Sequence, residues 1–166
     1  MSYSNDGLPV QHGAVAGVVA FIVGVVLTFV IGQVGLDAQL GLLVGFAPVL
    51  GTLWSYTAFH LWPMVLGSSG MGSFLVFVVL PIVILVGSGY WVASGAGRGG
   101  GFMQGASVTV GYFVLSLLTF VYIAFIAGNA QVTMEVGVDL VVALVMTGIV
   151  FPVVFGGIGG LLADGA

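Results

Sequence analysis

"GAVAGVVAFIVGVVLTFVIGQV", residues 13–34, is a long apolar run without one charged side chain. A helix needs about 20 such residues to cross the hydrocarbon core of a bilayer. The run exceeds the apolar core of a signal peptide, which has about 7–15 residues, and no Lys or Arg precedes it. We therefore interpret it as a retained membrane-spanning helix that follows a polar tail, residues 1–12.

The composition of the whole chain supports this interpretation. Of its 166 residues, 60% are hydrophobic and 4% are charged, and the mean hydropathy is +1.32. Soluble domains carry about a quarter charged residues, and one of this size buries only about 70% of the surface that its unfolded chain exposes. Lipid must cover the remaining apolar surface, so the sequence predicts a multi-pass protein of the cell membrane.

Four further apolar stretches are separated by Gly-rich or polar segments that are typical of short connections. Backbone groups find no water in lipid, so each stretch is expected to be helical. We predict an all-α transmembrane bundle that forms one domain, residues 13–162, with a short tail at 163–166. The five predicted spans are residues 13–34, 40–62, 72–94, 104–127 and 137–162.

The second span ends in "TLWSYTAFHLW", residues 52–62, which is rich in hydroxyl and aromatic side chains. This stretch either completes the span or lies along the membrane interface, which leaves four spans plus one interfacial helix as the alternative. On a helical wheel Trp54 falls on an apolar side. The opposite side is a polar stripe that faces either neighbouring helices or water, and it consists of Thr52, Ser55, Tyr56 and His60.

Arg98 is the one basic residue of the chain. Since Lys and Arg are enriched in cytoplasmic loops, it predicts a cytoplasmic position for its loop. With five spans, His12 then lies on the opposite side of the membrane from Arg98 and Asp164. An excess of acidic over basic residues argues against nucleic acid as a partner.

Catalytic signatures are scarce. "GAGRGG", residues 95–100, matches the dinucleotide-binding spacing but lacks the strand before it and the acidic residue that should follow. The absence of Cys excludes thiol nucleophiles and iron–sulfur clusters. We therefore expect neither an enzyme nor a bound cofactor. With five spans, two imidazoles and two carboxylates share one membrane side and are the candidates for a metal site: His12, His60, Glu135 and Asp139.

Glycines spaced by four residues allow helix backbones to approach closely, either within the chain or between copies. Such pairs predict packing positions at Gly13, Gly17, Gly41, Gly45, Gly156 and Gly160. Proline within a span removes a backbone hydrogen bond and kinks the helix. The hinge candidates are Pro48, Pro81 and Pro152.

Three stretches carry a resemblance to a known group of proteins. They are "GAVAGVVAFIVGVVLTFV", residues 13–30, "FLVFVVLPIVILVGSGYWVAS", residues 74–94, and "GASVTVGYFVL", residues 105–115. The chain resembles small, Gly-rich, multi-pass membrane proteins of haloarchaea that have no assigned biochemical function, some of which carry a transporter label. The resemblance implies a helical membrane fold and a halophilic source, and it supplies no functional residues.

Two functions fit these observations. The first is a non-enzymatic membrane subunit or scaffold, which forms a homo-oligomer or binds another membrane protein within the lipid bilayer. The second is a small-solute or ion transporter with a polar path along the second span. A scaffold should show tight glycine-mediated packing, whereas a transporter should show a polar cavity near the stripe.

Overall fold

The computed structural model describes residues 9–34, 75–96, 100–130 and 140–166. Within these ranges every regular element is a helix and no strand occurs, which confirms the predicted all-α class for this part of the chain. The second predicted span and the polar stripe lie outside the described residues. In chain order the elements are α1 (Pro9–Val34), α4 (Leu75–Gly95), α5 (Gly101–Ala106), α6 (Val108–Ala130), α7 (Leu140–Val145), the π-helical turns η2 (Met146–Val150) and η3 (Pro152–Gly156), and α8 (Gly157–Asp164).

Helix α1 begins earlier than the predicted Gly13. It starts at Pro9, which suits the first helical turn because an N–H there has no helical partner. At the other end of the chain, α8 runs on to Asp164 and so passes the predicted boundary at residue 162. The end of the apolar run is therefore a poor marker of the end of this helix.

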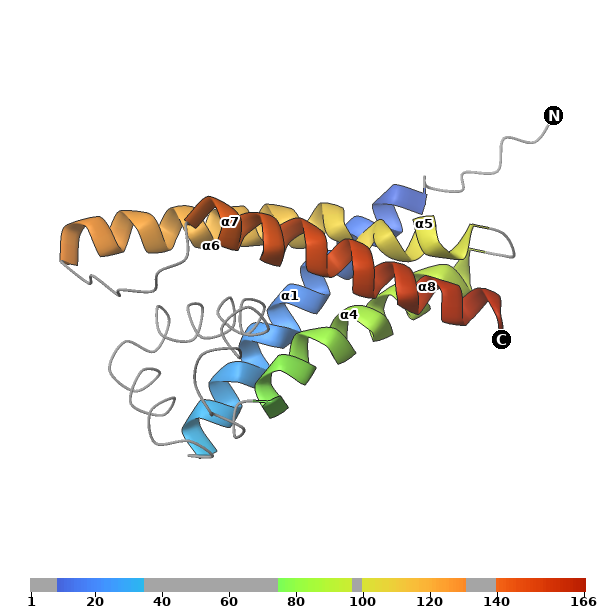
Figure 1. Ribbon diagram of the computed structural model, residues 1–166, viewed down its shortest axis with the longest axis horizontal. Helices are drawn as coiled ribbons and strands as arrows, with labels where there is room; N and C mark the ends of the chain where they lie inside the picture. Colours follow the sequence, from blue (N-terminus) through green and yellow to red (C-terminus); the bar gives the residue numbers. More distant parts are fainter. Residues whose placement is uncertain (1–8, 35–74, 97–99, 131–139) are drawn as a thin grey trace.

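Helices α5 and α6 form one rod interrupted at Ser107, and the segment from α7 to α8 returns beside it (Figure 1). Near the start of the first rod, the Gly101 amide donates a 2.8 Å hydrogen bond to Oδ2 of Asp164, at the end of the second. Toward the other end, Phe120 packs with Leu144. The two rods are therefore antiparallel.

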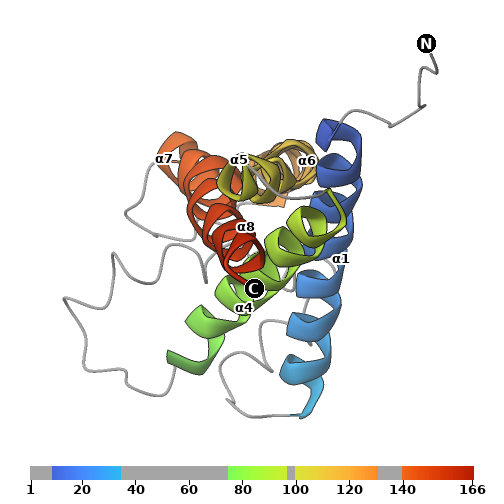
Figure 2. The ribbon, with the colours of Figure 1, turned by 90° about the vertical axis from the view of Figure 1, so that its right-hand side faces the viewer.

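Helices α1 and α4 form a second pair (Figures 1 and 2). The start of α1 lies at the start of the first rod, because a Cβ added to Gly13 would meet Ser107. Both views show the end of α1 and the start of α4 at the bottom, away from the end where α5 lies. The four long helical segments converge at the end where α5 lies.

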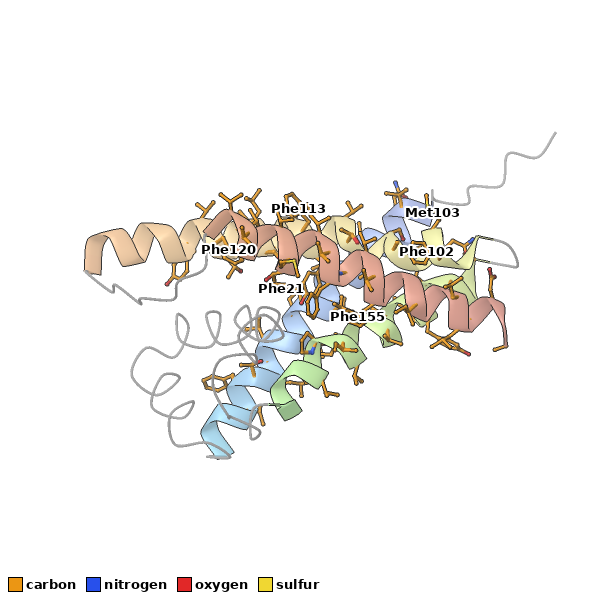
Figure 3. All side chains as sticks on the ribbon, viewed as in Figure 1. Phe21, Phe102, Met103, Phe113, Phe120 and Phe155 are labelled. Atoms are coloured by element: carbon orange, nitrogen blue, oxygen red, sulfur yellow. The ribbon has the colours of Figure 1, made fainter. Side chains whose placement is uncertain are left out.

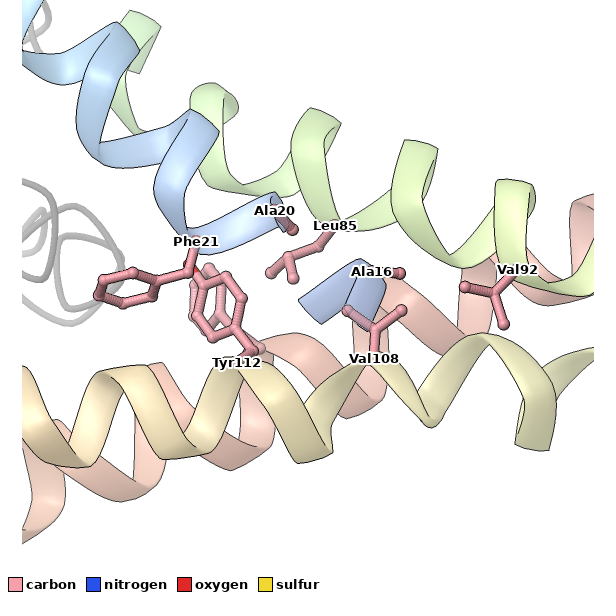
Figure 4. Packing of buried hydrophobic residues seen from close by; sticks show 8 residues of the cluster. Ala16, Ala20, Phe21, Leu85, Val92, Val108 and Tyr112 are labelled. Atoms are coloured by element: carbon pink, nitrogen blue, oxygen red, sulfur yellow. The ribbon is translucent and has the colours of Figure 1, made fainter. Parts of the chain in front are cut away.

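The core lies where α1, α4 and α6 cross (Figure 4). Phe21 of α1 meets Tyr112 of α6 edge to face, with ring centroids 5.1 Å apart. Leu85 of α4 is fully buried beside Ala16 and Ala20 of α1. Small residues on α1 thus let large side chains from two other helices fill the centre.

Side chains that point away from this core are also apolar (Figure 3). Trp91, for example, is 64% exposed and Val15 is 60% exposed. Helices that are apolar all round belong in a membrane or a large core. Among the described residues, three helical stretches are long and apolar enough to cross a membrane, and α4 contributes a shorter apolar one, Val79–Gly95. The three are Val10–Val30, Gly101–Tyr122 and Met146–Asp164.

The two ends of the described chain lie at the same end of the bundle. His12 is in the first turns of α1, next to Gly13, and Asp164 binds the start of α5. With five spans these two residues are expected on opposite membrane sides. The structure shows them at the same end of the bundle, and the number of spans stays a prediction.

Candidate functional site

Glycines bring the backbones of α1 and α6 into direct contact. A Cβ on Gly17 would overlap the Val108 carbonyl oxygen and lie 2.6 Å from the Tyr112 amide nitrogen. From the facing helix, a Cβ on Gly111 would overlap the Ala14 carbonyl oxygen. Because glycine has no side chain, helices that meet at glycines approach more closely than any other residue permits. We call this contact the α1–α6 seam, formed by Gly13, Gly17 and Gly111.

A larger contact of the same kind joins α4 and α5 to α8 and to Gly156, the last residue of η3. A Cβ on Gly89 would overlap the Gly156 carbonyl oxygen and lie 2.8 Å from the Gly156 Cα. One on Gly105 would overlap the same carbonyl oxygen and lie 2.8 Å from the Gly160 amide nitrogen. Three helices therefore meet through backbone atoms alone. We call this contact the α8 seam, formed by Gly89, Gly101, Gly105, Gly156, Gly159 and Gly160.

Four of the six predicted packing glycines belong to these seams. Gly13 and Gly17 face α6, and Gly156 and Gly160 face α4 and α5, all within one chain. The remaining pair, Gly41 and Gly45, lies outside the described residues. Contact between copies would therefore have to use residues other than these four.

Two of the three predicted hinge prolines lie in described helices, and both are fully buried. Pro81 is inside α4, which continues on both sides of it. Pro152 begins η3, and Phe151 alone separates it from η2. Because proline has no N–H, the preceding turn lacks one hydrogen-bond donor, and the chain forms wider π-helical turns here. Pro48 lies outside the described residues, and motion at any of the three stays a prediction.

Buried hydroxyl groups accompany the π-helical turns, and the sequence analysis did not select them. Ser116 of α6 and Thr147 of η2 are both 0% exposed, and neither hydroxyl has a hydrogen-bond partner among the described residues. Thr28 of α1 is equally buried, but its hydroxyl donates to the Gly24 carbonyl at 2.8 Å. Ser and Thr in apolar helices often make such an internal bond, so their presence in the sequence does not by itself indicate a binding site.

The Asp164 carboxylate links the end of α8 to the start of α5. Oδ2 of Asp164 accepts the hydrogen bond from the Gly101 amide, in the first turn of α5. Gly100, which precedes α5, has a φ of 92°, a left-handed conformation that glycine adopts without strain. The first amides of a helix lack helical partners and favour negative charge, so Asp164 stabilises the start of α5. The sequence analysis placed Asp164 in a tail and assigned it no role.

Replacing Asp164 with Ala is expected to destabilise the protein by about 1 kcal/mol, the usual effect of removing a capping carboxylate. Asp164→Asn keeps an acceptor oxygen and loses only the charge, so its effect should be smaller. Thermal unfolding in detergent measures both. Equal stability of Asp164→Ala and the parent protein would show that the bond contributes nothing.

The family model of DUF7978, a family of unknown function, matches residues 55–166, about two thirds of the chain. The chain belongs to DUF7978. Neither a curated protein nor a solved structure matches it. The DUF7978 region holds α4 to α8, and with them the whole α8 seam, the two buried hydroxyls and Asp164. Helix α1, with Gly13 and Gly17, precedes this region.

Most of the residues predicted to form the polar stripe or a metal site in this DUF7978 member lie outside the described ranges. His12 is described, and it is exposed near the start of α1. Among the described residues, no three His, Cys, Asp or Glu side chains come together as a metal site would require. The residues outside the described ranges are Thr52, Ser55, Tyr56, His60, Glu135 and Asp139.

Proposed function

We propose that this DUF7978 member is a non-enzymatic subunit or scaffold of the cell membrane. The observation that carries the proposal is the α8 seam, in which Gly89, Gly105 and Gly156 bring three helix backbones together. Such close contact favours a rigid structural junction. Exposed apolar side chains surround it, so the partner would be recognised within the bilayer, as a second copy of this chain or another membrane protein.

The arrangement of α1 and α4 favours four membrane crossings by the described helical segments. The end of α1 and the start of α4 lie at one end of the bundle, while His12 and Asp164 lie at the other. This supports the alternative of four spans plus an interfacial helix over the count of five. Placement of the His12 end in the cytoplasm follows from the position of Arg98 in the sequence.

Transport of a small solute or ion is the second candidate function. The predicted path along the second span lies outside the described residues. Support comes instead from the hydroxyls of Ser116 and Thr147, which are buried without a hydrogen-bond partner among the described residues. Buried hydroxyls are expected to have such partners, and a small polar solute in the bundle would supply them.

Purification in mild detergent tests the proposed scaffold role. We expect native mass spectrometry to detect either a multiple of the 16.9 kDa chain or this chain together with another membrane protein. Dissociation in a harsh detergent provides the control for non-covalent association. A single chain without a partner, found across several mild detergents, would contradict the proposal.

A further inference from the structure

Three buried hydroxyl oxygens without a hydrogen-bond partner among the described residues lie along the contact of α6 with the second rod. Two of them, in Thr109 and Ser116, belong to α6, and the third, in Thr147, belongs to η2. A separation of seven residues places Thr109 and Ser116 on the same face of a helix. Thr28, equally buried in α1, is satisfied by its own helix. Burial in the bundle therefore does not by itself leave a hydroxyl without a partner.

The contacts around Gly148 show which face of α6 this is. A Cβ on Gly148 would lie 2.9 Å from the Phe113 ring and 3.4 Å from the Ser116 Cβ. Thr147 is the neighbour of Gly148 in η2. Phe113 lies in the first half of α6 (Figure 3). Ser116 and Thr147 are thus at the same level of the bundle.

Pro152 adds a backbone acceptor at this level. A π-helical amide donates to the carbonyl five residues earlier, and an α-helical amide to the one four residues earlier. Pro152 has no N–H and so offers neither Thr147 nor Gly148 such a bond. The Phe151 amide donates to the Met146 carbonyl. Ser116, Thr147 and the turn before Pro152 therefore share one level of the bundle, where the helix widens.

Size and charge limit what these oxygens bind. The close packing around Gly148 argues against a large ligand beside Ser116. Ser, Thr and backbone carbonyls are neutral, and no described residue of η2 or η3 carries a charged side chain. A desolvated ion without a counter-charge is costly in an apolar interior, whereas water donates and accepts hydrogen bonds at no such penalty.

We infer that the contact between α6 and η2 is a water-binding site formed by Ser116, Thr147 and the backbone turn before Pro152. Bound water supplies the donor that Pro152 lacks and the partners that both hydroxyls need. In membrane helices, ordered water and π-helical adjustments are known ways to satisfy backbone groups freed by proline. The site goes beyond the scaffold role and does not depend on it.

X-ray hydroxyl-radical footprinting of the full chain in detergent detects this site, because radicals form from bound water next to buried side chains. Phe113, beside Gly148, and Met146, next to Thr147 in η2, are the reporters, and both are partly buried. Each is compared with the same residue in Thr147→Val, because bulk water also oxidises partly exposed side chains and methionine reacts faster than phenylalanine. We expect oxidation of both reporters to be higher in the parent protein than in the variant. Equal oxidation in the two proteins would overturn the inference.

The melting temperature of Thr147→Val provides a second, independent measurement. The substitution keeps the shape of the side chain and removes the hydroxyl, so the bound water loses a partner. We expect a melting temperature lower by about 2–4 °C. If the hydroxyl has no hydrogen-bond partner, water included, Thr147→Val should instead raise the melting temperature, because removing an unsatisfied buried polar group stabilises a protein. An unchanged or raised melting temperature therefore counts against bound water.

Matched variants separate hydration from general damage to the fold. Thr147→Ser keeps the hydroxyl and should keep the oxidation of Phe113. Thr28→Val removes an equally buried hydroxyl that bonds within α1, and it should leave the oxidation of Phe113 unchanged. Loss of Phe113 oxidation in either control would show that packing, rather than the Thr147 hydroxyl, controls it.

Discussion

Gly89→Ala is expected to destabilise the bundle by about 3 kcal/mol, at the upper end of the range for overpacked cores. The added methyl group would overlap the Gly156 carbonyl oxygen and lie 2.7 Å from its carbonyl carbon. Both atoms belong to the backbone, so no side chain can rotate away, and α4 must move away from the end of η3, where α8 begins. Thermal unfolding in detergent should show a melting temperature lower by about 6–12 °C.

Gly87→Ala is the matched control on the same helix. A Cβ on Gly87 would meet nothing within 4 Å, so only helix propensity changes, and alanine is favoured over glycine by up to about 1 kcal/mol. This variant should melt at the parent temperature or above it. If Gly87→Ala and Gly89→Ala melt together, the α8 seam does not hold α4 against α8.

Single cysteines at positions 12 and 166 should react with a membrane-impermeant maleimide from the same side of the membrane. His12 lies near the start of α1 and Ala166 just after α8, and both are exposed. The parent chain contains no Cys, so it gives no background. Labelling of sealed vesicles in the two orientations should therefore give an all-or-none result, identical for His12→Cys and Ala166→Cys.

Asn129→Cys reports on the opposite side. Asn129 is in the last turn of α6, at the far end of the bundle from Asp164. It should react only in the vesicle orientation that protects the other two positions. Labelling of His12→Cys and Ala166→Cys from opposite sides would support the five-span count instead.

Helical structure could be predicted from residues 13–34 and 104–127 because lipid leaves an apolar backbone segment few alternatives to a helix. The exact ends could not, since Pro9 and Asp164 extend α1 and α8 through local interactions that hydropathy does not record. The halophilic source stays a prediction.

Side chains at the candidate site were harder to predict. Ser116 and Thr147 are separated by 31 positions of chain, and nothing in either neighbourhood indicates that α6 meets η2. Asp164 likewise acquires a role only because the antiparallel rods bring it to Gly101. Local sequence patterns predict the properties of a single helix, whereas these residues act through contacts between helices.

By itself, the sequence determined that the chain forms apolar helices with closely packing glycines. It could not show which face of each helix is buried, because lipid and the bundle interior are both apolar and the helices lack a polar side. Along α1, Val15 and Val19 are exposed whereas Ala16 and Ala20 are buried. Only the tertiary structure decided this, since backbone contact at Gly17 requires small neighbours such as Ala16 and Ala20 on that face and leaves Val15 and Val19 on the outside.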